Sequence, residues 1–166
     1  MYTHTHLQCG RFVTRNGARV LPDVASLLNV AVALMVASPW AFHLVDGYKI
    51  WEIRKRDISF RGRMAIALIG SGMLWGEVEV VDSFFMTMGG LCLPSSIDNH
   101  RIPVHDLSTY AGTGGGTYAS GGGGYVIVMQ NAVRYPYPIP YEHNLGAQLL
   151  VRLDRPGLEG RVISMD

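Results

Sequence analysis

The chain has 166 residues, of which 48% are hydrophobic and 16% are charged, and its formal net charge is +1 at pH 7. This length and composition predict one compact globular domain and exclude an intrinsically disordered chain. The longest apolar run, residues 24–37, is shorter than the roughly twenty residues that a membrane-spanning helix needs, so we expect it in a protein core. The two cysteines, Cys9 and Cys92, lack the spacing of a metal site and are expected to be free thiols in a reducing compartment.

The first residues of the chain are basic and lack acids. Residues 1–21 contain three arginines and no Asp or Glu, as mitochondrial transit peptides do, but they show no clear amphipathic repeat. We therefore expect an intracellular protein, with the cytoplasm as the first choice and the mitochondrion as the alternative. Asn16-Gly17 predicts a tight turn between two short strands, Pro22-Asp23 predicts the start of a helix, and residues 32–37 predict the first strand of the main domain.

Positive charge is concentrated in residues 49–63. This segment carries six basic and two acidic side chains, a local charge of +4, whereas the other eight basic and eleven acidic residues sum to −3. Such a concentration attracts anions, phosphates among them. A solvated basic loop is the alternative that charge alone leaves open.

A helix signal and a strand signal follow one another in this part of the chain. Pro39 and Asp46-Gly47 predict the two ends of a short helix. The alternation of residue types that follows predicts a strand, with Glu52 and Arg54 on one face and Ile53 on the core face. A carboxylate and a guanidinium two positions apart on one face are expected to pair.

The order of residue types across this segment is distinctive. It is defined by Pro39-Trp40-Ala41, Gly47, Lys49, Glu52, Arg54, Arg61-Gly62 and an apolar strand at 64–70. This order resembles the ASCH (activating-signal-cointegrator homology) domain, a branch of the PUA-like β-barrels. The likeness continues through Gly76-Glu77-Val78, residues 100–103, Asn131 and residues 138–141.

The resemblance implies an α+β, mainly β fold: a small PUA-like (ASCH) barrel with a few peripheral helices. It divides the chain into an N-terminal extension at 1–31, one ASCH domain at 32–153 and a C-terminal tail at 154–166. We see no internal repeat and no second domain.

Two strands are expected after the basic segment. Residues 64–69 are apolar throughout, as a strand covered on both faces is. Residues 74–81 alternate, with Leu74 and Val78 on the core face. Trp75 and Glu77 share the other face, which in the resembling family helps to wall the central cavity; a solvent-facing edge is the alternative.

The segment that follows is interpreted as a connection. Residues 84–110 predict an excursion over the barrel with one short helix at 105–110, and His100 and His105 lack the spacing of a metal site. Residues 112–124 predict a flexible glycine-rich surface loop. Tyr118 in that loop folding over a ligand is the alternative.

The last third of the chain is expected to complete the barrel. Residues 125–130 predict a buried strand, and residues 145–153 predict the strand that closes the sheet. Between them, residues 135–141 predict an extended, proline-stiffened segment. It is either a packing strap across the barrel mouth or an aromatic wall for a base, made by Tyr135, Tyr137 or Tyr141.

Binding of RNA, or of a modified nucleobase or nucleoside, is the function that the resemblance and the basic segment favour. Basic side chains would contact phosphates, and aromatic rings would stack on an unpaired base. The predicted ligand-binding residues are Trp40, Lys49, Glu52, Arg54, Arg56, Arg61, Trp75, Glu77 and Tyr141. We expect RNA or a nucleotide-like ligand as the partner, with no metal, other cofactor or membrane, and protein partners stay open.

Three other functions stay open. Some small ASCH-like proteins resemble amidohydrolases of N4-acetylcytidine with a Lys, Thr and Glu set. Lys49 matches their lysine, whereas Ile50 and Glu52 fill the positions where those enzymes carry threonine. If this protein is an enzyme, Lys49 and Glu52 are its candidate catalytic residues. Because a neighbouring carboxylate favours the ammonium form, we expect Glu52 to raise the pKa of Lys49 and to make it a poor base. A ribonuclease using His43 or His143, and a structural subunit of a ribonucleoprotein, are the remaining alternatives.

Overall fold

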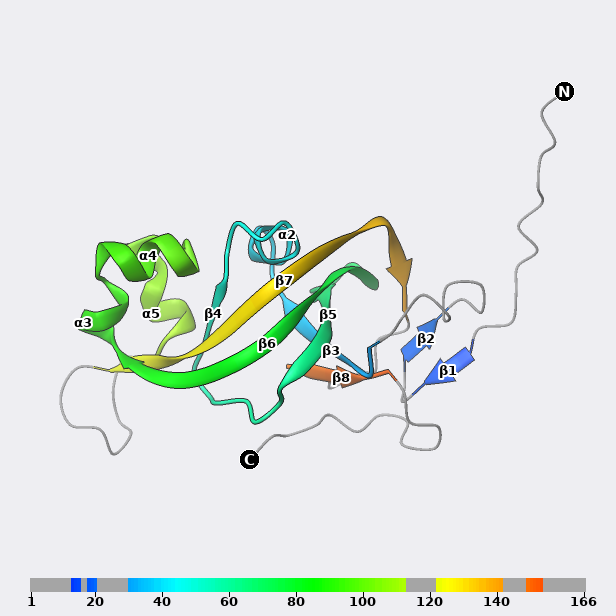
Figure 1. Cartoon of the computed structure of the whole chain (residues 1–166), viewed down its shortest axis with the longest axis horizontal. Helices are drawn as coiled ribbons and strands as arrows, with labels where there is room; N and C mark the ends of the chain where they lie inside the picture. Colours follow the sequence, from blue (N-terminus) through cyan, green and yellow to red (C-terminus); the bar gives the residue numbers. More distant parts are fainter. Residues whose placement is uncertain (1–12, 16–17, 21–29, 113–121, 142–148, 154–166) are drawn as a thin grey trace, which may run out of the picture.

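A six-stranded mixed sheet organises the molecule. The computed structural model describes residues 13–15, 18–20, 30–112, 122–141 and 149–153 (Figure 1). The strand order is β4-β7-β6-β5-β3-β8, in which only the β3–β5 pair is parallel. The strands are β3 (Val32–Val36), β4 (Trp51–Arg54), β5 (Gly62–Leu68), β6 (Met73–Thr87), β7 (Gly123–Pro140) and β8 (Leu150–Arg152). The mainly β fold with few helices is therefore confirmed.

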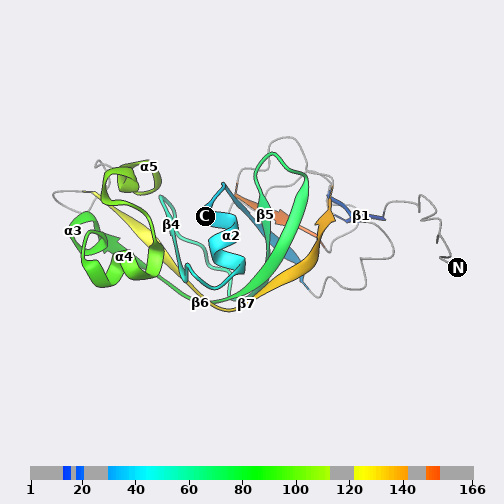
Figure 2. The same ribbon diagram turned by 90° about the horizontal axis from the view of Figure 1, so that it is seen from above.

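Short helices cover one end and the inside of the sheet. The helices are α2 (Trp40–Val45), α3 (Met88–Leu91), α4 (Pro94–His100), the 3-10 turn η1 (Val104–Asp106) and α5 (Leu107–Tyr110). The pair β6–β7 is long and curved, and α2 lies inside the curve, while α3, α4 and α5 gather beside β4 (Figure 2). Near the amino terminus, β1 (Val13–Arg15) and β2 (Ala18–Val20) form the predicted antiparallel pair.

Closure of the sheet into a barrel is not seen in the described strands. The hydrogen-bonded order runs from β4 to β8, and these two end strands do not pair with each other. A side chain spans the opening instead: Arg54 Nη2 on β4 donates to the backbone oxygen of Met35 on β3 at 2.7 Å. Ile58, in the connection from β4 to β5, is fully buried. The sheet is thus curled, and this side-chain bond connects the end strand β4 to β3, the neighbour of the other end strand β8, without a backbone ladder.

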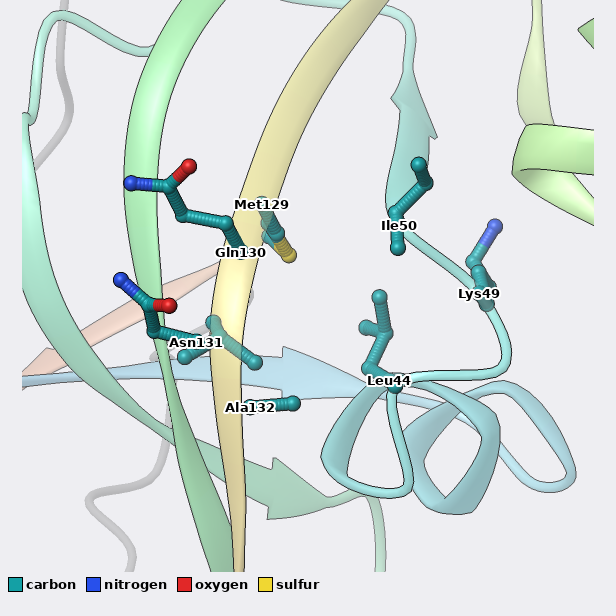
Figure 3. A pocket seen from close by; sticks show the side chains of 9 residues that line it. Leu44, Lys49, Ile50, Met129, Gln130, Asn131 and Ala132 are labelled. Atoms are coloured by element: carbon teal, nitrogen blue, oxygen red, sulfur yellow. The ribbon is translucent and has the colours of Figure 1, made fainter.

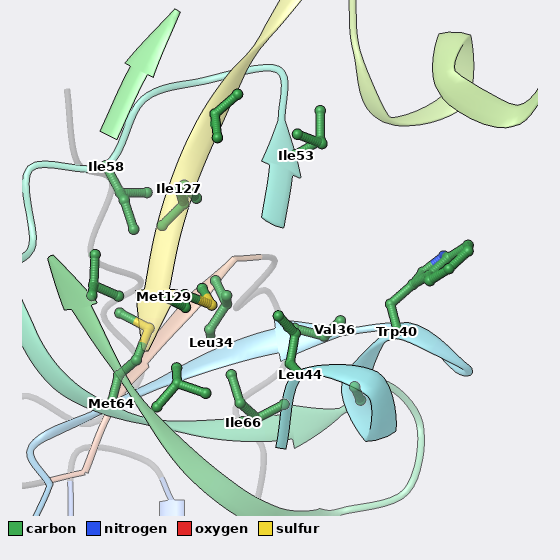
Figure 4. Close-up of a cluster of buried hydrophobic side chains, with 14 of the residues drawn as sticks. Leu34, Val36, Trp40, Leu44, Ile53, Ile58, Met64, Ile66, Ile127 and Met129 are labelled. Atoms are coloured by element: carbon green, nitrogen blue, oxygen red, sulfur yellow. The ribbon is translucent and has the colours of Figure 1, made fainter. Parts of the chain in front are cut away.

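The main core fills the concave side of the curled sheet. Leu44 from α2 converges there with Leu34 from β3 and Met129 from β7 (Figure 4), and each is 3% exposed or less. The predicted alternation in β6 is confirmed, because Leu74 and Val78 are buried. Burial of one apolar stripe of α2 fixes this helix against the sheet.

Helix α2 begins and ends where the sequence predicts. Its amino-terminal cap is Pro39, whose fixed φ suits the start of a helix. It ends at Asp46, and Gly47 takes a φ of +72°, a conformation that only glycine adopts without strain. After this turn the chain continues through residues 48–50 into β4.

Three predicted elements differ from the structure. Strand β6 continues to Thr87 instead of ending at residue 81. The excursion that follows holds α3, α4, η1 and α5 rather than one short helix. The proline-rich segment is part of β7, because Arg134 pairs with Gly76 and Ile139 pairs with Leu74.

Two of the prolines in β7, Pro136 and Pro138, are tolerated because the strand bulges there. Between those two pairs, residues 135–138 stand opposite the single residue Trp75. A bulge leaves backbone groups out of the ladder, so the missing N–H groups of Pro136 and Pro138 break no pairing. The predicted helix start at 22–23, the glycine loop around Tyr118, and His143 lie outside the described residues.

Candidate functional site

The charged residues predicted to meet on β4 do so. Arg54 Nε lies 2.9 Å from Glu52 Oε1, and Lys49 Nζ lies 3.3 Å from Glu52 Oε2. Lys49 Nζ also donates a 2.8 Å hydrogen bond to the backbone oxygen of His100, at the end of α4. The side chain of Lys49 is 0% exposed and that of Glu52 is 6% exposed. We call these residues the Lys49–Glu52–Arg54 cluster; it ties β4 to both α4 and β3.

Burial controls the protonation of Lys49. Desolvation lowers its pKa below the ordinary value, and this effect is larger than the opposing attraction of Glu52. The Trp40 ring, whose centroid is 5.5 Å from Nζ, contributes to the enclosure. Glu52 does favour the ammonium form, but the expected net increase in pKa is wrong because the cost of desolvation exceeds that attraction.

His100 has a structural position beside this cluster. Its Nε2 lies 2.9 Å from the backbone oxygen of Leu91, and its Nδ1 accepts a 3.0 Å hydrogen bond from the Ile102 N–H. Burial lowers the pKa of His100, so the neutral ring is favoured. His105 is exposed. Within the part of the chain that the structure describes, no group of three or more His, Cys, Asp or Glu side chains is placed to hold a metal ion.

A pocket of about 270 Å³ lies between β7 and the turn that joins α2 to β4 (Figure 3). It is lined by Leu44, Gly47, Lys49, Ile50, Val78, Met129, Gln130, Asn131 and Ala132. Its walls are mainly apolar. The ammonium group of Lys49 points away from β7 and out of this pocket (Figure 3). Glu52 and Arg54 do not line it, so the cluster supports the pocket wall from behind.

A bulge in β7 shapes the pocket. Glu77 pairs with Val133 and Glu79 pairs with Gln130, so Asn131 and Ala132 stand opposite the single residue Val78. Asn131 has a φ of +50°, a conformation that asparagine adopts more readily than most residues. Bulges often adjoin functional sites because they redirect side chains.

Glu79 fixes two amide side chains on the side of β7 that faces away from the pocket (Figure 3). Its Oε2 accepts hydrogen bonds from Gln130 Nε2 at 3.2 Å and from Asn131 Nδ2 at 2.7 Å. These bonds lower the pKa of Glu79. Because Glu79 alternates with the buried Val78, both amides lie on the outer face of the β6–β7 pair and do not project into the pocket.

Trp40 is the one predicted aromatic residue that reaches the cluster. It is 9% exposed, and its Nε1 donates a 2.8 Å hydrogen bond to Tyr110 Oη. The ring thereby packs α2 against α5. Trp40 is placed to enclose Lys49 rather than to stack on a ligand.

Three other predicted ligand residues lie elsewhere. Glu77 alternates with the buried Val78, and it binds Arg63 and Tyr135 instead, with Arg63 Nε donating to Oε1 at 2.8 Å. Trp75 packs edge-on against Phe42, with ring centroids 4.9 Å apart. Tyr141 is 5% exposed within a second apolar cluster, and burial raises its pKa to about 12. The structure does not bring Trp75, Glu77 or Tyr141 to the pocket.

The six basic residues of 49–63 do not form one surface. Lys49 and Arg54 face the interior, and Arg63 pairs with Glu77. Arg61 donates to the backbone oxygens of Ile58 and Phe60 at 3.0 and 2.9 Å. Lys55 and Arg56 are exposed. The concentration of charge in the sequence therefore overstates the cationic surface available to an anion.

Comparison with solved structures identifies the fold. A serine-to-alanine mutant of ZmASCH from Zymomonas mobilis matches with a TM-score of 0.58 at 13% identity, covering 74% of this chain and 87% of that chain. A tyrosine-to-phenylalanine mutant of the same protein has a TM-score of 0.53 at 12% identity and covers 66% of this chain and 74% of that one. The ASCH structure without a stated mutation has a TM-score of 0.52 at 13% identity, with 66% and 72% covered.

The chain therefore has an ASCH-like fold, as its sequence predicts. No protein-family model and no curated protein sequence matches it. Among the described residues, no helix is long and apolar enough to cross a membrane.

Proposed function

We propose that this protein binds RNA and accommodates an unpaired or modified base in the pocket between β7 and the α2–β4 turn. The observation that carries the proposal is the pocket itself: about 270 Å³, with mainly apolar walls. Small-molecule pockets are typically about 300–1,000 Å³, so this one suits a single base or nucleoside. The PUA-like domains that this chain resembles commonly read such ligands.

The chemistry of the pocket fits a base. A flat ring would pack between apolar side chains, of which Met129 can adapt its shape because its side chain is unbranched and flexible. Lys55 and Arg56, which are exposed, would contact phosphates.

The Lys49–Glu52–Arg54 cluster has a positioning role in this proposal. Its charged groups satisfy one another and the backbone of α4 and β3, and they fix the residues that precede β4. Ile50, which forms part of the pocket, lies between Lys49 and Glu52 in the chain. The cluster therefore holds the pocket wall in place, while its charged groups point away from the ligand.

Filling the mouth of the pocket tests the proposal. Ile50 lines the pocket and is 38% exposed, so Ile50→Trp should block entry while leaving the core intact. We expect the Kd for nucleosides, including cytidine and N4-acetylcytidine, to rise at least about tenfold, the equivalent of losing one good contact of about 1.4 kcal/mol. Isothermal titration calorimetry measures this change.

The matched control is Val133→Trp, which places the same side chain at a position that is 48% exposed and does not line the pocket. It should bind as the unmodified protein does. Equal affinities for the two tryptophan variants, with both folded by thermal denaturation, would contradict the pocket assignment.

An amidohydrolase is the second candidate, favoured by one observation. Burial lowers the pKa of Lys49, which makes a neutral, nucleophilic amine more accessible than in water. The geometry opposes this function, because Nζ is enclosed and already bonded to the His100 backbone. In this conformation a substrate does not reach Nζ, because the Lys49 side chain is 0% exposed.

We therefore expect no release of acetate from N4-acetylcytidine above background. Chromatography of cytidine formed over time measures this activity. Turnover that disappears in Lys49→Arg, a variant that keeps the charge but cannot become neutral near pH 7, would establish the enzyme instead.

A further inference from the structure

Tyr48 and Arg101 form a second feature next to the pocket. Tyr48 lies in the chain between Gly47 and Lys49, both of which line the pocket, and it is 54% exposed. The guanidinium carbon of Arg101 is 4.2 Å from the centroid of the Tyr48 ring. Arg101 Nε also donates a 3.0 Å hydrogen bond to the Tyr48 backbone oxygen. The His43 ring supports Tyr48 edge-on, with centroids 5.1 Å apart.

The backbone at Arg101 is held in an uncommon conformation. Its φ is +61°, at the position after α4 where glycine or asparagine usually ends a helix. For other residues this left-handed conformation is unfavourable. Glycine would relieve the backbone, but it would lack the guanidinium that covers Tyr48. Among the described residues, Arg101 forms one ion pair, with Asp98, in which the nitrogen and oxygen are 3.6 Å apart.

We propose, as an extension of the RNA-binding function above, that Tyr48 and Arg101 form a stacking platform for the base adjacent to the one in the pocket. An exposed aromatic ring and a guanidinium plane are both flat groups on which unpaired bases stack. Arg101 also brings a positive charge to the phosphate that joins the two nucleotides. The ligand is thus single-stranded RNA of at least two nucleotides, because bases in a duplex already stack on one another.

This platform predicts a difference between short and long ligands. Stacking on one aromatic side chain contributes enough to change affinity by about tenfold or more per base. The wild-type protein should therefore bind a dinucleotide or a hexanucleotide more tightly than a nucleoside. A nucleoside fills the pocket alone and does not reach Tyr48.

The test compares Tyr48→Ala with Tyr48→Phe and with Tyr137→Ala. Tyr137 is 82% exposed on the β7 bulge and serves as the control tyrosine. Fluorescence anisotropy with a labelled hexanucleotide should show about tenfold weaker binding for Tyr48→Ala and an unchanged Kd for the other two variants. Calorimetry with cytidine should show the same Kd for all of them.

Each outcome separates the platform from the pocket. Equal losses for cytidine and the hexanucleotide in Tyr48→Ala, or no loss for either, would overturn the platform. A wild-type protein that binds the hexanucleotide no more tightly than cytidine would also overturn it. If cytidine does not bind but Tyr48→Ala still weakens binding of the hexanucleotide, the platform stands and the pocket proposal fails.

Discussion

Lys49→Met should lower the free energy of unfolding by about 3–5 kcal/mol, the usual cost of removing one partner from a buried ion pair. Methionine keeps the apolar stem but loses the ammonium, which bonds to Glu52 and to the His100 backbone. Glu52 would stay buried with Arg54 as its remaining ion-pair partner, and the end of α4 would lose its link to β4. Urea unfolding followed by tryptophan fluorescence measures the change.

Two further variants show whether the ion pair is the cause. Lys55→Met makes the same substitution at an exposed position of the basic segment and should change stability by about 0.5 kcal/mol or less. Lys49→Met combined with Glu52→Gln removes both partners of the Lys49–Glu52 contact, so its loss of stability should be smaller than the sum of the losses in the two single variants. If the double variant is less stable than the sum of the single changes predicts, the cluster is not held together by the Lys49–Glu52 contact.

The lowered pKa of Lys49 gives this contribution a pH dependence. Between the lowered pKa and the ordinary value of 10.5, the unfolded chain binds more protons at this position than the folded protein does. The wild-type protein should therefore gain stability relative to Lys49→Met as the pH rises through that range. Tyr135 and Tyr141 have the opposite effect: their pKa values are raised in the folded protein, so their contribution to stability is lost as the pH rises above the ordinary tyrosine pKa. Both proteins contain these tyrosines, so the difference between the two proteins does not include this effect.

Local patterns in the sequence were sufficient for the elements around the site. The period-2 alternation predicts that Glu52 and Arg54 share a face, and the structure pairs them. Pro39 and Gly47 mark the limits of α2 because each restricts or permits a particular φ. These preferences depend on the residue itself and its immediate neighbours, so they do not depend on how distant parts of the chain pack.

The pocket and the stacking platform could not be predicted in the same way. The pocket depends on an extra residue in β7 opposite Val78, and a bulge leaves no mark on hydrophobic periodicity. The platform joins Tyr48 to a residue 53 positions away, through a left-handed conformation that the sequence does not signal. Asn131 and Arg101 both appear in the ASCH resemblance, but the resemblance gave neither of them a role.

Charge composition was the least reliable guide to the site. It showed that residues 49–63 are basic, but it did not show that Arg63 forms an ion pair with Glu77 or that the Lys49 side chain is buried. Ion pairs across strands depend on register, and desolvation depends on what covers the side chain. The RNA-contacting cations we now propose are therefore Arg101, Lys55 and Arg56, rather than the whole segment.

Gly76→Ala should lower the free energy of unfolding by about 3 kcal/mol or more, because the new methyl group has no space. A Cβ atom at this position would lie 2.4 Å from the Val133 backbone oxygen and 2.8 Å from Val45 Cγ1. A side chain can rotate away, but the Val133 carbonyl belongs to the β6–β7 ladder, so relief requires α2 and both strands to separate. The control is Gly89→Ala in α3, where a Cβ meets no atom within 4 Å and should stabilise the helix by about 0.5–1 kcal/mol. Thermal and urea denaturation should therefore show a lower free energy of unfolding for Gly76→Ala and a higher one for Gly89→Ala. A Gly76→Ala protein as stable as the wild type would show that α2 does not pack closely against the β6–β7 pair.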